Sequence, residues 1–402
     1  MVKVSTSLNK ENYRIGSYFP EFMSALFLFL FSLLHPFVQS SSSSAIILFV
    51  ASLFALSILY IYIIVNGERK ISFRAELVMC SVVFTLLFFD ILCRENDNIS
   101  SYIYNFLLNG VLPMLFLASV REYKPLLWFY AHFAILTGLI YLLDPLLYNY
   151  KWSIDYMQYG YNYMMPAVFG SMLMFFYFKK KVYLPIIFIF TISIFIFANK
   201  GAIFAEVVGL VYYYLNVYKK NKVSIYKYAF VILLIFLVIY NFEVLIYYGF
   251  NIANMLEIGD SYSLNTFAVL FSSDSSYVVS QRTELWDLAL KMLEEKPLLG
   301  WGVGWYEKFS TQPYPHNFVY EILVEYGLVG GILFSLFFVI SFRKLLKTVD
   351  FGKKVFLFTL LILWIIPLSI SLTFWKTTYF WAFWFLLYTT PKCLRINNVK
   401  RV

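Results

Sequence analysis

Charged residues are scarce in this sequence. Asp, Glu, Lys and Arg together make up 14% of its 402 residues, whereas soluble domains carry roughly 25%. Hydrophobic residues account for 61% of the chain, and aromatic residues alone for 22%. This composition excludes an ordinary soluble domain and predicts an all-α, polytopic integral membrane protein.

Cysteine and histidine are also rare, with three residues of each type. Cys80 and Cys93 fall in one predicted helix, about 20 Å apart at 1.5 Å per residue, and Cys393 lies in a segment predicted to face the cytoplasm. This arrangement implies no disulfide framework. Asp, Glu and His do not form a convincing metal-ligand cluster in the sequence, so no metal framework is implied either.

Nucleotide-binding and nucleic-acid-binding patterns are missing as well. The glycine cluster GWGVG at residues 300–304 has no strand before it and no GK[ST] after it, so it does not match a phosphate-binding loop. A hinge in an outer loop is the better interpretation. We find no basic helix with interleaved aromatic residues, and no nucleic-acid partner is expected.

Apolar runs long enough to cross a membrane recur along the whole chain. A helix needs about 17 to 25 residues to cross roughly 30 Å of hydrocarbon. The absence of an internal repeat weakens a transporter interpretation, because many transporter folds contain paired halves. We expect a single transmembrane domain over residues 1–402 with about twelve spans, near residues 19–38, 44–65, 77–93, 102–120, 125–144, 163–178, 182–198, 201–218, 228–248, 316–341, 355–374 and 377–390.

The distribution of Lys and Arg predicts the orientation of these spans, because both residues are retained on the cytoplasmic side. With the N-terminus inside, the cytoplasmic segments hold 24 of the 32 Lys and Arg residues. We therefore expect both termini in the cytoplasm. This topology explains most of the net charge of +9, which is then poor evidence for nucleic-acid binding.

One segment on the predicted outer face, residues 249–315, is long enough to be functional. We expect it to form a large extracytoplasmic loop between the ninth and tenth spans. Residues 282–295 within it predict an amphipathic helix that lies on the membrane or against the spans. The apolar residues on one face of that helix are Leu285, Leu288, Ala289 and Met292.

Three residues on the outer face are candidates for chemistry. Lys200 lies in a tight turn between two spans, Arg282 opens the amphipathic helix, and His316 directly precedes an apolar helix. An anionic diphosphate beside a membrane needs fixed cations, and Arg grips it in a bidentate fork. A His with an ordinary pKa near 6.5 accepts a proton at neutral pH. The structural alternatives are that Lys and Arg snorkel to lipid headgroups and that His316, with Asn317 as a cap, only starts a helix.

Two acidic residues follow in the same helix. Glu321 and Glu325 are spaced four residues apart, which places them on one helical face. Ionisable residues inside a span are costly and are functional candidates by default. Either carboxylate can pair with Arg282 or Lys200 across the site.

Other polar and small residues in the predicted spans suggest structural roles. For Asp90 and Glu243 we favour hydrogen bonding between helices over catalysis. Gly327, Gly330 and Gly331 permit close approach of neighbouring helices, and we assign them to packing.

Three stretches of the sequence match successive motifs of one family: ANKGA, SQRTELWDLALKMLEEKPLLGWGVGWY and HNFVYEILVEYGLVG. They resemble the superfamily of O-antigen polymerases and O-antigen ligases, membrane enzymes that join lipid-linked glycans. The resemblance covers about residues 195–335, and its most specific part is the pattern H-N, nine residues, G, two residues, G. The family usually carries Arg in the outer turn where this chain has Lys200, which keeps the charge but loses the fork.

The resemblance implies a GT-C-like helical bundle in the bacterial inner membrane, with a glycosyltransferase site open to the outer side. The donor it implies is a glycan on undecaprenyl diphosphate, without a metal or another cofactor. His316 and Arg282 are the implied catalytic residues. The implied substrate-binding residues are Arg282, Lys200, Asn317, Glu321 and Glu325.

Two members of the superfamily differ only in the acceptor. A polymerase adds the growing glycan to the next lipid-linked repeat unit, with a chain-length regulator protein as a candidate partner, and a ligase adds it to lipid A-core. The segment YMQYGYNYMMP at residues 156–166 favours a capsule or exopolysaccharide polymerase. A polysaccharide flippase, from another class, would explain the spans but not a His, an Arg and a Lys gathered on one face.

Overall fold

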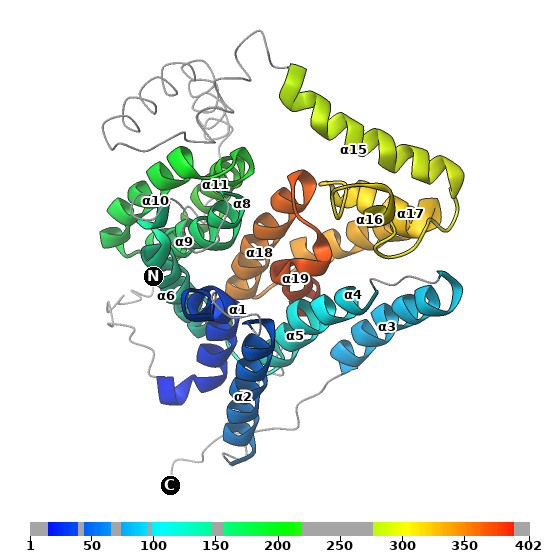
Figure 1. Cartoon of the computed structure of the whole chain (residues 1–402). Helices are drawn as coiled ribbons and strands as arrows, with labels where there is room; N and C mark the ends of the chain where they lie inside the picture. Colours follow the sequence, from blue (N-terminus) through cyan, green and yellow to red (C-terminus); the bar gives the residue numbers. More distant parts are fainter. Residues whose placement is uncertain are drawn as a thin grey trace.

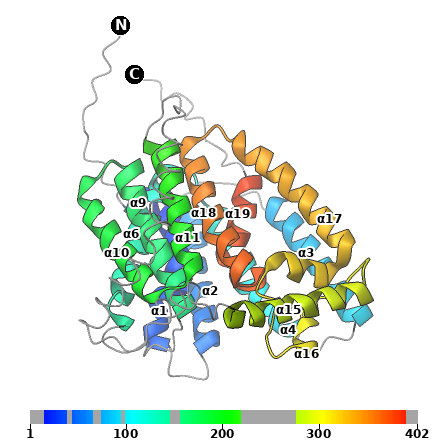
Figure 2. The same ribbon diagram turned by 90° about the horizontal axis from the view of Figure 1, so that it is seen from above.

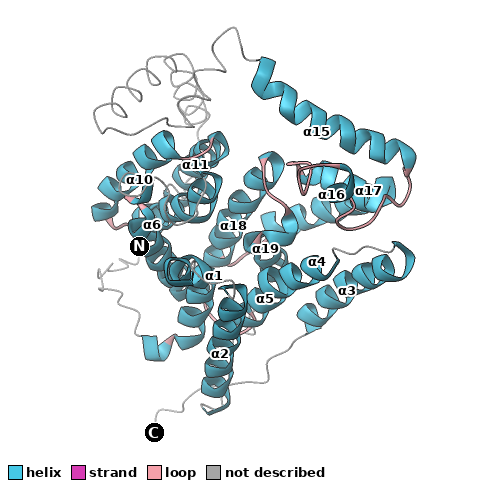
Figure 3. Ribbon diagram, in the orientation of Figure 1, coloured by secondary structure: helices cyan, strands magenta, loops and turns pink. Residues whose placement is uncertain are grey.

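The computed structural model describes residues 15–38, 44–65, 74–94, 99–145, 156–218 and 276–389. Within these ranges the regular elements are helices, and no strand occurs (Figure 1, Figure 3). The predicted all-α class is therefore confirmed. The predicted span near residues 228–248 and the first part of the predicted outer loop, up to residue 275, lie outside the described residues.

The helices follow the apolar runs of the sequence. Most are α-helices, and short π-helical or 3₁₀ turns join or extend several of them. In chain order the elements are η1 (Ile15–Ser17), α1 (Phe19–Val38), α2 (Ser44–Val65), α3 (Arg74–Arg94), α4 (Ile99–Phe106), η2 (Leu107–Val111), α5 (Leu112–Leu117), α6 (Tyr123–Tyr141), α8 (Tyr156–Gln158), η3 (Tyr159–Met164), α9 (Met165–Met172), η4 (Leu173–Tyr177), η5 (Lys181–Tyr183), α10 (Leu184–Phe197), α11 (Lys200–Tyr212), η6 (Tyr213–Tyr218), α15 (Ser276–Glu295), α16 (Tyr306–Phe309), α17 (Phe318–Leu346), α18 (Phe351–Ile370), η7 (Phe374–Lys376) and α19 (Thr378–Tyr388).

Several of these helices have the length and hydropathy of membrane spans. In the part of the chain that the structure describes, four continuous helices qualify: Ile99–Leu117, Lys200–Tyr218, Phe318–Leu346 and Phe351–Ile370. Shorter apolar helices accompany them at Phe19–Leu34, Val50–Ile63, Met79–Phe88 and Lys181–Phe197. The chain is therefore a helical membrane protein, as its composition predicts.

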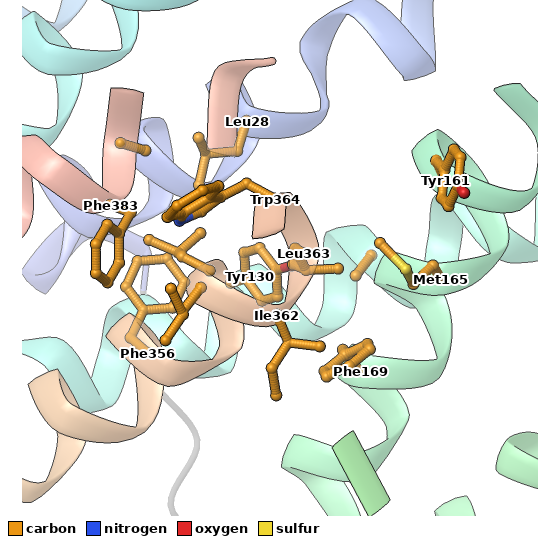
Figure 4. Packing of buried hydrophobic residues seen from close by; sticks show 14 of the residues in the cluster. Leu28, Tyr130, Tyr161, Met165, Phe169, Phe356, Ile362, Leu363, Trp364 and Phe383 are labelled. Atoms are coloured by element: carbon orange, nitrogen blue, oxygen red, sulfur yellow. The ribbon is translucent and has the colours of Figure 1, made fainter. Parts of the chain in front are cut away.

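Buried aromatic side chains fix the centre of the bundle. Helix α6 packs against α1, α9 and α18. The ring of Tyr130 in α6 lies 5.1 Å from Phe29 and 5.3 Å from Phe356, centroid to centroid. Trp364 of α18 continues this layer toward α19 (Figure 4). Large rings that interlock in this way leave few alternative packings, so the bundle is a rigid base for the segments that carry the site.

Helix α15 lies across the bundle beside α17 (Figure 2). It contains the amphipathic segment 282–295 and begins six residues earlier. Ala289 and Met292 are buried with Tyr306 and Val324 in a small apolar cluster. The apolar face of α15 is thus turned toward the protein, which decides between the two placements that the sequence left open.

Helix α17 is divided by a kink, whereas the sequence predicts one uninterrupted span. Gly327 has φ 64° and ψ −165°, so the helical pattern stops there and starts again at the next residue. The backbone N–H groups of Leu328 and Val329 donate to the carbonyls of Pro297 and Leu298, at 2.8 and 3.1 Å. The segment that follows α15 is therefore hydrogen-bonded to α17 at the kink.

The glycine turn, residues 300–304, is fastened to the same kink. Trp301 N donates to the carbonyl of Val324 at 2.7 Å, and Gly302 N donates to the carbonyl of Glu325 at 3.0 Å. The three glycines of the turn all have positive φ, a conformation that costs glycine little. These hydrogen bonds correct the interpretation of the turn as a hinge: it joins α15 to α17.

The contact at the kink predicts a test of stability. A Cβ added to Gly327 would lie 2.3 Å from the carbonyl oxygen of Leu298, and positive φ disfavours alanine. We expect Gly327→Ala to lower the free energy of unfolding by roughly 2 to 4 kcal/mol. Gly331→Ala is the matched control, because the nearest atom at 2.7 Å is the end of the Leu323 side chain. Thermal unfolding of both purified variants in one detergent gives the comparison, and equal stabilities would contradict the role of the kink.

Candidate functional site

His316 is held rigidly at the entrance of α17. Its Nδ1 lies 2.8 Å from the carbonyl oxygen of Ser371. A carbonyl only accepts hydrogen bonds, so Nδ1 carries the proton and Nε2 keeps its lone pair. The backbone of His316 has φ 54°, which is uncommon for a residue other than glycine. The ring is thus fixed in the tautomer that can accept a proton at Nε2.

The surroundings of His316 keep it uncharged. Burial lowers the pKa of the imidazole below its usual value of 6.5, and the Arg282 guanidinium lowers this pKa further. The hydrogen bond to Ser371 acts in the opposite direction. With a lowered pKa, the neutral base is the main form at neutral pH.

Helix α15 brings Arg282 toward His316. Trp286 donates its indole N–H to the carbonyl of Pro315 at 3.2 Å, and its ring stacks on Tyr320 at 5.7 Å. Arg282 lies four residues before Trp286, and residues at that spacing share one face of a helix. The exposed Arg282 side chain therefore lies on the side of α15 that faces the segment leading into His316.

Lys200 joins this group from a different part of the chain. It is the first residue of α11. The Arg282 guanidinium interacts electrostatically with Lys200, with Tyr161 and with His316. The structure thus brings together the His, the Arg and the Lys that the sequence singles out, from three segments that are far apart in the chain.

Asn317 has a positioning role. Its Oδ1 accepts a hydrogen bond from Val319 N at 2.9 Å, which caps α17, and its Nδ2 donates to the carbonyl of Ser369 at 3.2 Å. Both ends of the amide are engaged by the protein. Asn317 therefore holds the start of α17 against the end of α18, next to His316.

Glu321 and Glu325 are buried in the short limb of α17 that precedes the kink. Glu321 accepts a hydrogen bond from Thr373 Oγ1 at 2.5 Å. Glu325 accepts from the Trp375 indole at 3.2 Å and from Gly304 N at 3.3 Å. The two carboxylates therefore bind the loop between α18 and α19 and the glycine turn.

Other charged groups complete this network. Lys376 is the cation that interacts electrostatically with Glu321, in place of the expected Arg282 or Lys200. Asp90 of α3 accepts a hydrogen bond from Val303 N at 3.1 Å, so it contacts the glycine turn, and its predicted hydrogen bonding between helices stays a prediction. Glu243 lies outside the described residues.

A small cavity adjoins His316. The ring of Tyr314 lies 4.7 Å from the His316 ring, centroid to centroid, and also lines the cavity. The cavity has room for about one water molecule. The complete lining is Tyr102, Gly304, Tyr306, Pro313, Tyr314, Pro315, Glu321, Val324 and Glu325.

Some residues of the site have no signal in the sequence. Ser371 acts through its carbonyl, which every residue type has, and Trp286 reads as one more aromatic residue of an amphipathic helix. Among the described residues, no group of three or more His, Cys, Asp or Glu side chains is placed to hold a metal ion.

Comparison with known proteins adds one match. Residues 185–335 match the model of a family described as O-antigen ligase. This range contains Lys200, Arg282 and His316, and the match confirms the resemblance to the superfamily of O-antigen polymerases and ligases. No curated protein matches the chain.

Proposed function

From the match of residues 185–335 to the O-antigen ligase family, we propose that the chain is a polysaccharide polymerase. It transfers a growing glycan from undecaprenyl diphosphate to the next lipid-linked repeat unit. The observation that carries the proposal is the meeting of His316, Arg282 and Lys200 at one place. A ligase with lipid A-core as acceptor is the alternative, and the segment at residues 156–166 favours the polymerase.

The chemistry is a single displacement at the anomeric carbon of the donor sugar. Nε2 of His316 takes the proton of an acceptor hydroxyl, and that oxygen attacks the anomeric carbon. The bond from this carbon to the diphosphate oxygen breaks, and the diphosphate leaves with the electron pair. Arg282 and Lys200 stabilise its negative charge. His316 then releases its proton to water.

The length of α17 supports a site at the membrane surface. The limb from Leu328 to Leu346 is about 28 Å long at 1.5 Å per residue, close to the ~30 Å of the hydrocarbon core. The kink then lies at the outer boundary of the hydrocarbon. His316 and the limb from Phe318 to Tyr326 lie beyond it, at the level of the lipid headgroups.

Aromatic and basic residues beside the kink support the same level. The Lys296 ammonium lies 3.8 Å from the centroid of the Trp301 ring, and that of Lys308 lies 4.1 Å from the Trp305 ring. Leu298, hydrogen-bonded to the start of the long limb, is 66% exposed. Trp and Lys are enriched where protein meets headgroups. Exposed leucine at this level suits contact with acyl chains.

The remaining architecture belongs to the same proposal. We place the chain in the bacterial inner membrane with about twelve spans in a GT-C-like bundle, the site on the outer side and both termini in the cytoplasm. The distribution of Lys and Arg, with 24 of 32 in the segments assigned to the cytoplasm, supports this orientation. A chain-length regulator remains a candidate partner.

The orientation predicts the accessibility of α15. Glu294 is exposed on this helix, so a cysteine introduced there in a background without native cysteines should react with an impermeant thiol reagent from the periplasmic side. A cysteine at exposed Lys347, at the other end of α17, is the matched control and should react only after the inner membrane is opened. The reverse pattern would refute the proposed orientation.

Removal of the proposed base predicts a loss of polymer. His316→Ala should lower the rate of chain extension by roughly 10² to 10⁴-fold, the usual contribution of a general base. The assay uses purified protein and a lipid-linked repeat unit without lipid A-core, so that polymer formation itself separates a polymerase from a ligase. His132→Ala is the control, because His132 Nδ1 bonds to the carbonyl of Trp128 within α6, away from the site.

The pH dependence of the same reaction gives a further check on His316. Protonation of the ring removes the base, and its pKa is lowered from 6.5. The acidic limb of kcat/KM should therefore lie below pH 6.5. Normal chain extension by His316→Ala would show that His316 only starts a helix and is not the base.

The two cations predict different responses to exchange. If Arg282 holds the diphosphate through its planar fork, Arg282→Lys should lose most of the activity although the charge is kept. Lys200→Arg restores the residue usual in the superfamily and should be tolerated. Polymer length in the purified reaction is the measurement. Full activity of both variants would show that the diphosphate binds elsewhere.

A further inference from the structure

Two buried hydrogen-bond donors lie unused near the start of α11. Tyr161 is 2% exposed, and its hydroxyl has no hydrogen-bond partner. Nδ2 of Asn199 is likewise buried without a partner, while Oδ1 of the same side chain accepts from Ala202 N at 2.9 Å and caps α11. Buried polar groups without partners are costly and uncommon in proteins. Both donors are therefore suited to receive an acceptor from a ligand.

Both donors lie against the first turn of α11. A Cβ added to Gly201 would lie 2.0 Å from the Tyr161 hydroxyl oxygen. A Cβ added to Gly160 would lie 2.8 Å from Nδ2 of Asn199. Gly201 of α11 leaves room for the Tyr161 hydroxyl, and Gly160 of η3 leaves room for Nδ2 of Asn199. Both donors can therefore lie close to the start of α11.

The same place is rich in positive charge. Lys200 and Arg282 interact electrostatically with each other, and Arg282 also interacts with Tyr161. Two like charges brought together repel each other, and the N-terminus of a helix adds a further positive potential. An anion placed there relieves the repulsion and accepts hydrogen bonds from the free donors.

We propose that Tyr161 and Asn199, together with Lys200 and Arg282, form the binding site for the diphosphate of the lipid-linked donor. This inference rests on the proposed function and adds two neutral donors to the site. The Tyr161 hydroxyl and Nδ2 of Asn199 donate to diphosphate oxygens, and the two cations balance its charge.

Binding measurements on the purified full-length protein test this site. The probe is farnesyl diphosphate, a soluble isoprenoid diphosphate, titrated calorimetrically in detergent. Tyr161→Phe removes only the hydroxyl, and Asn199→Ser keeps an oxygen that can cap α11 but removes the amide donor. Each variant should bind the probe about 10 to 100-fold more weakly, the range for a lost hydrogen bond to a charged group.

The matched control is Tyr213→Phe. Its hydroxyl is also buried, but it is hydrogen-bonded to Thr359 Oγ1 at 2.5 Å in the core. This variant should bind the probe like the unmodified protein. Wild-type affinity in both Tyr161→Phe and Asn199→Ser would overturn the proposal.

A competition arm identifies the source of the phosphate. Phosphatidylglycerol should displace farnesyl diphosphate only weakly, and equal displacement would overturn the proposal in favour of a headgroup site. The outcomes also separate this site from the proposed function. Weak binding in the variants of a protein that makes no polymer leaves the site standing without the polymerase, and normal binding beside active polymerisation leaves the polymerase standing without the site.

Discussion

The backbone contact between the glycine turn and the kink of α17 is the constraint on which the site depends. Gly300 and Gly327 approach so closely that a Cβ on either residue would meet the backbone of the other segment within 2.6 Å. This approach allows four backbone hydrogen bonds between the segment 297–302 and the residues of α17 on both sides of the kink. It fixes the C-terminal end of α15 to α17. Arg282 lies about three to four helical turns back along α15 from that end, so the helix holds Arg282 near His316.

Two buried carboxylates of α17 hold further segments of the chain near the site. Glu321 and Glu325 accept hydrogen bonds from the loop after α18, and the same loop supplies the Ser371 carbonyl that orients His316. A carboxylate offers several acceptor positions at one point, so it can join segments whose own backbone groups would otherwise be unpaired. The acids near the site thus act on His316 indirectly, by holding the loop on which its tautomer depends.

The sequence predicts the helices and the gathering of the three candidate side chains far better than the connections between the helices. Apolar runs mark the helices because burial in a membrane demands them, and Lys200, Arg282 and His316 are visible as polar exceptions at helix borders. Gly327 is visible only as a glycine, since no pattern of residue types distinguishes a packing glycine from one with positive φ. Tyr161 is hidden for a similar reason: one tyrosine among 34 acquires meaning only when its hydroxyl is found without a partner.

The kink also affects how a substrate finds this protein. A straight α17 of 29 residues would be about 43 Å long and would carry its first residue well out into the water. The bend turns the first limb aside and, in the membrane placement that we propose, keeps His316 near the plane of the headgroups. The lipid-linked glycan that we propose as the substrate is confined to that plane, so its encounter with the site is a search in two dimensions. The rate of supply then depends on the mole fraction of the carrier lipid in the membrane and on its lateral diffusion, and hardly on the volume of the surrounding compartment.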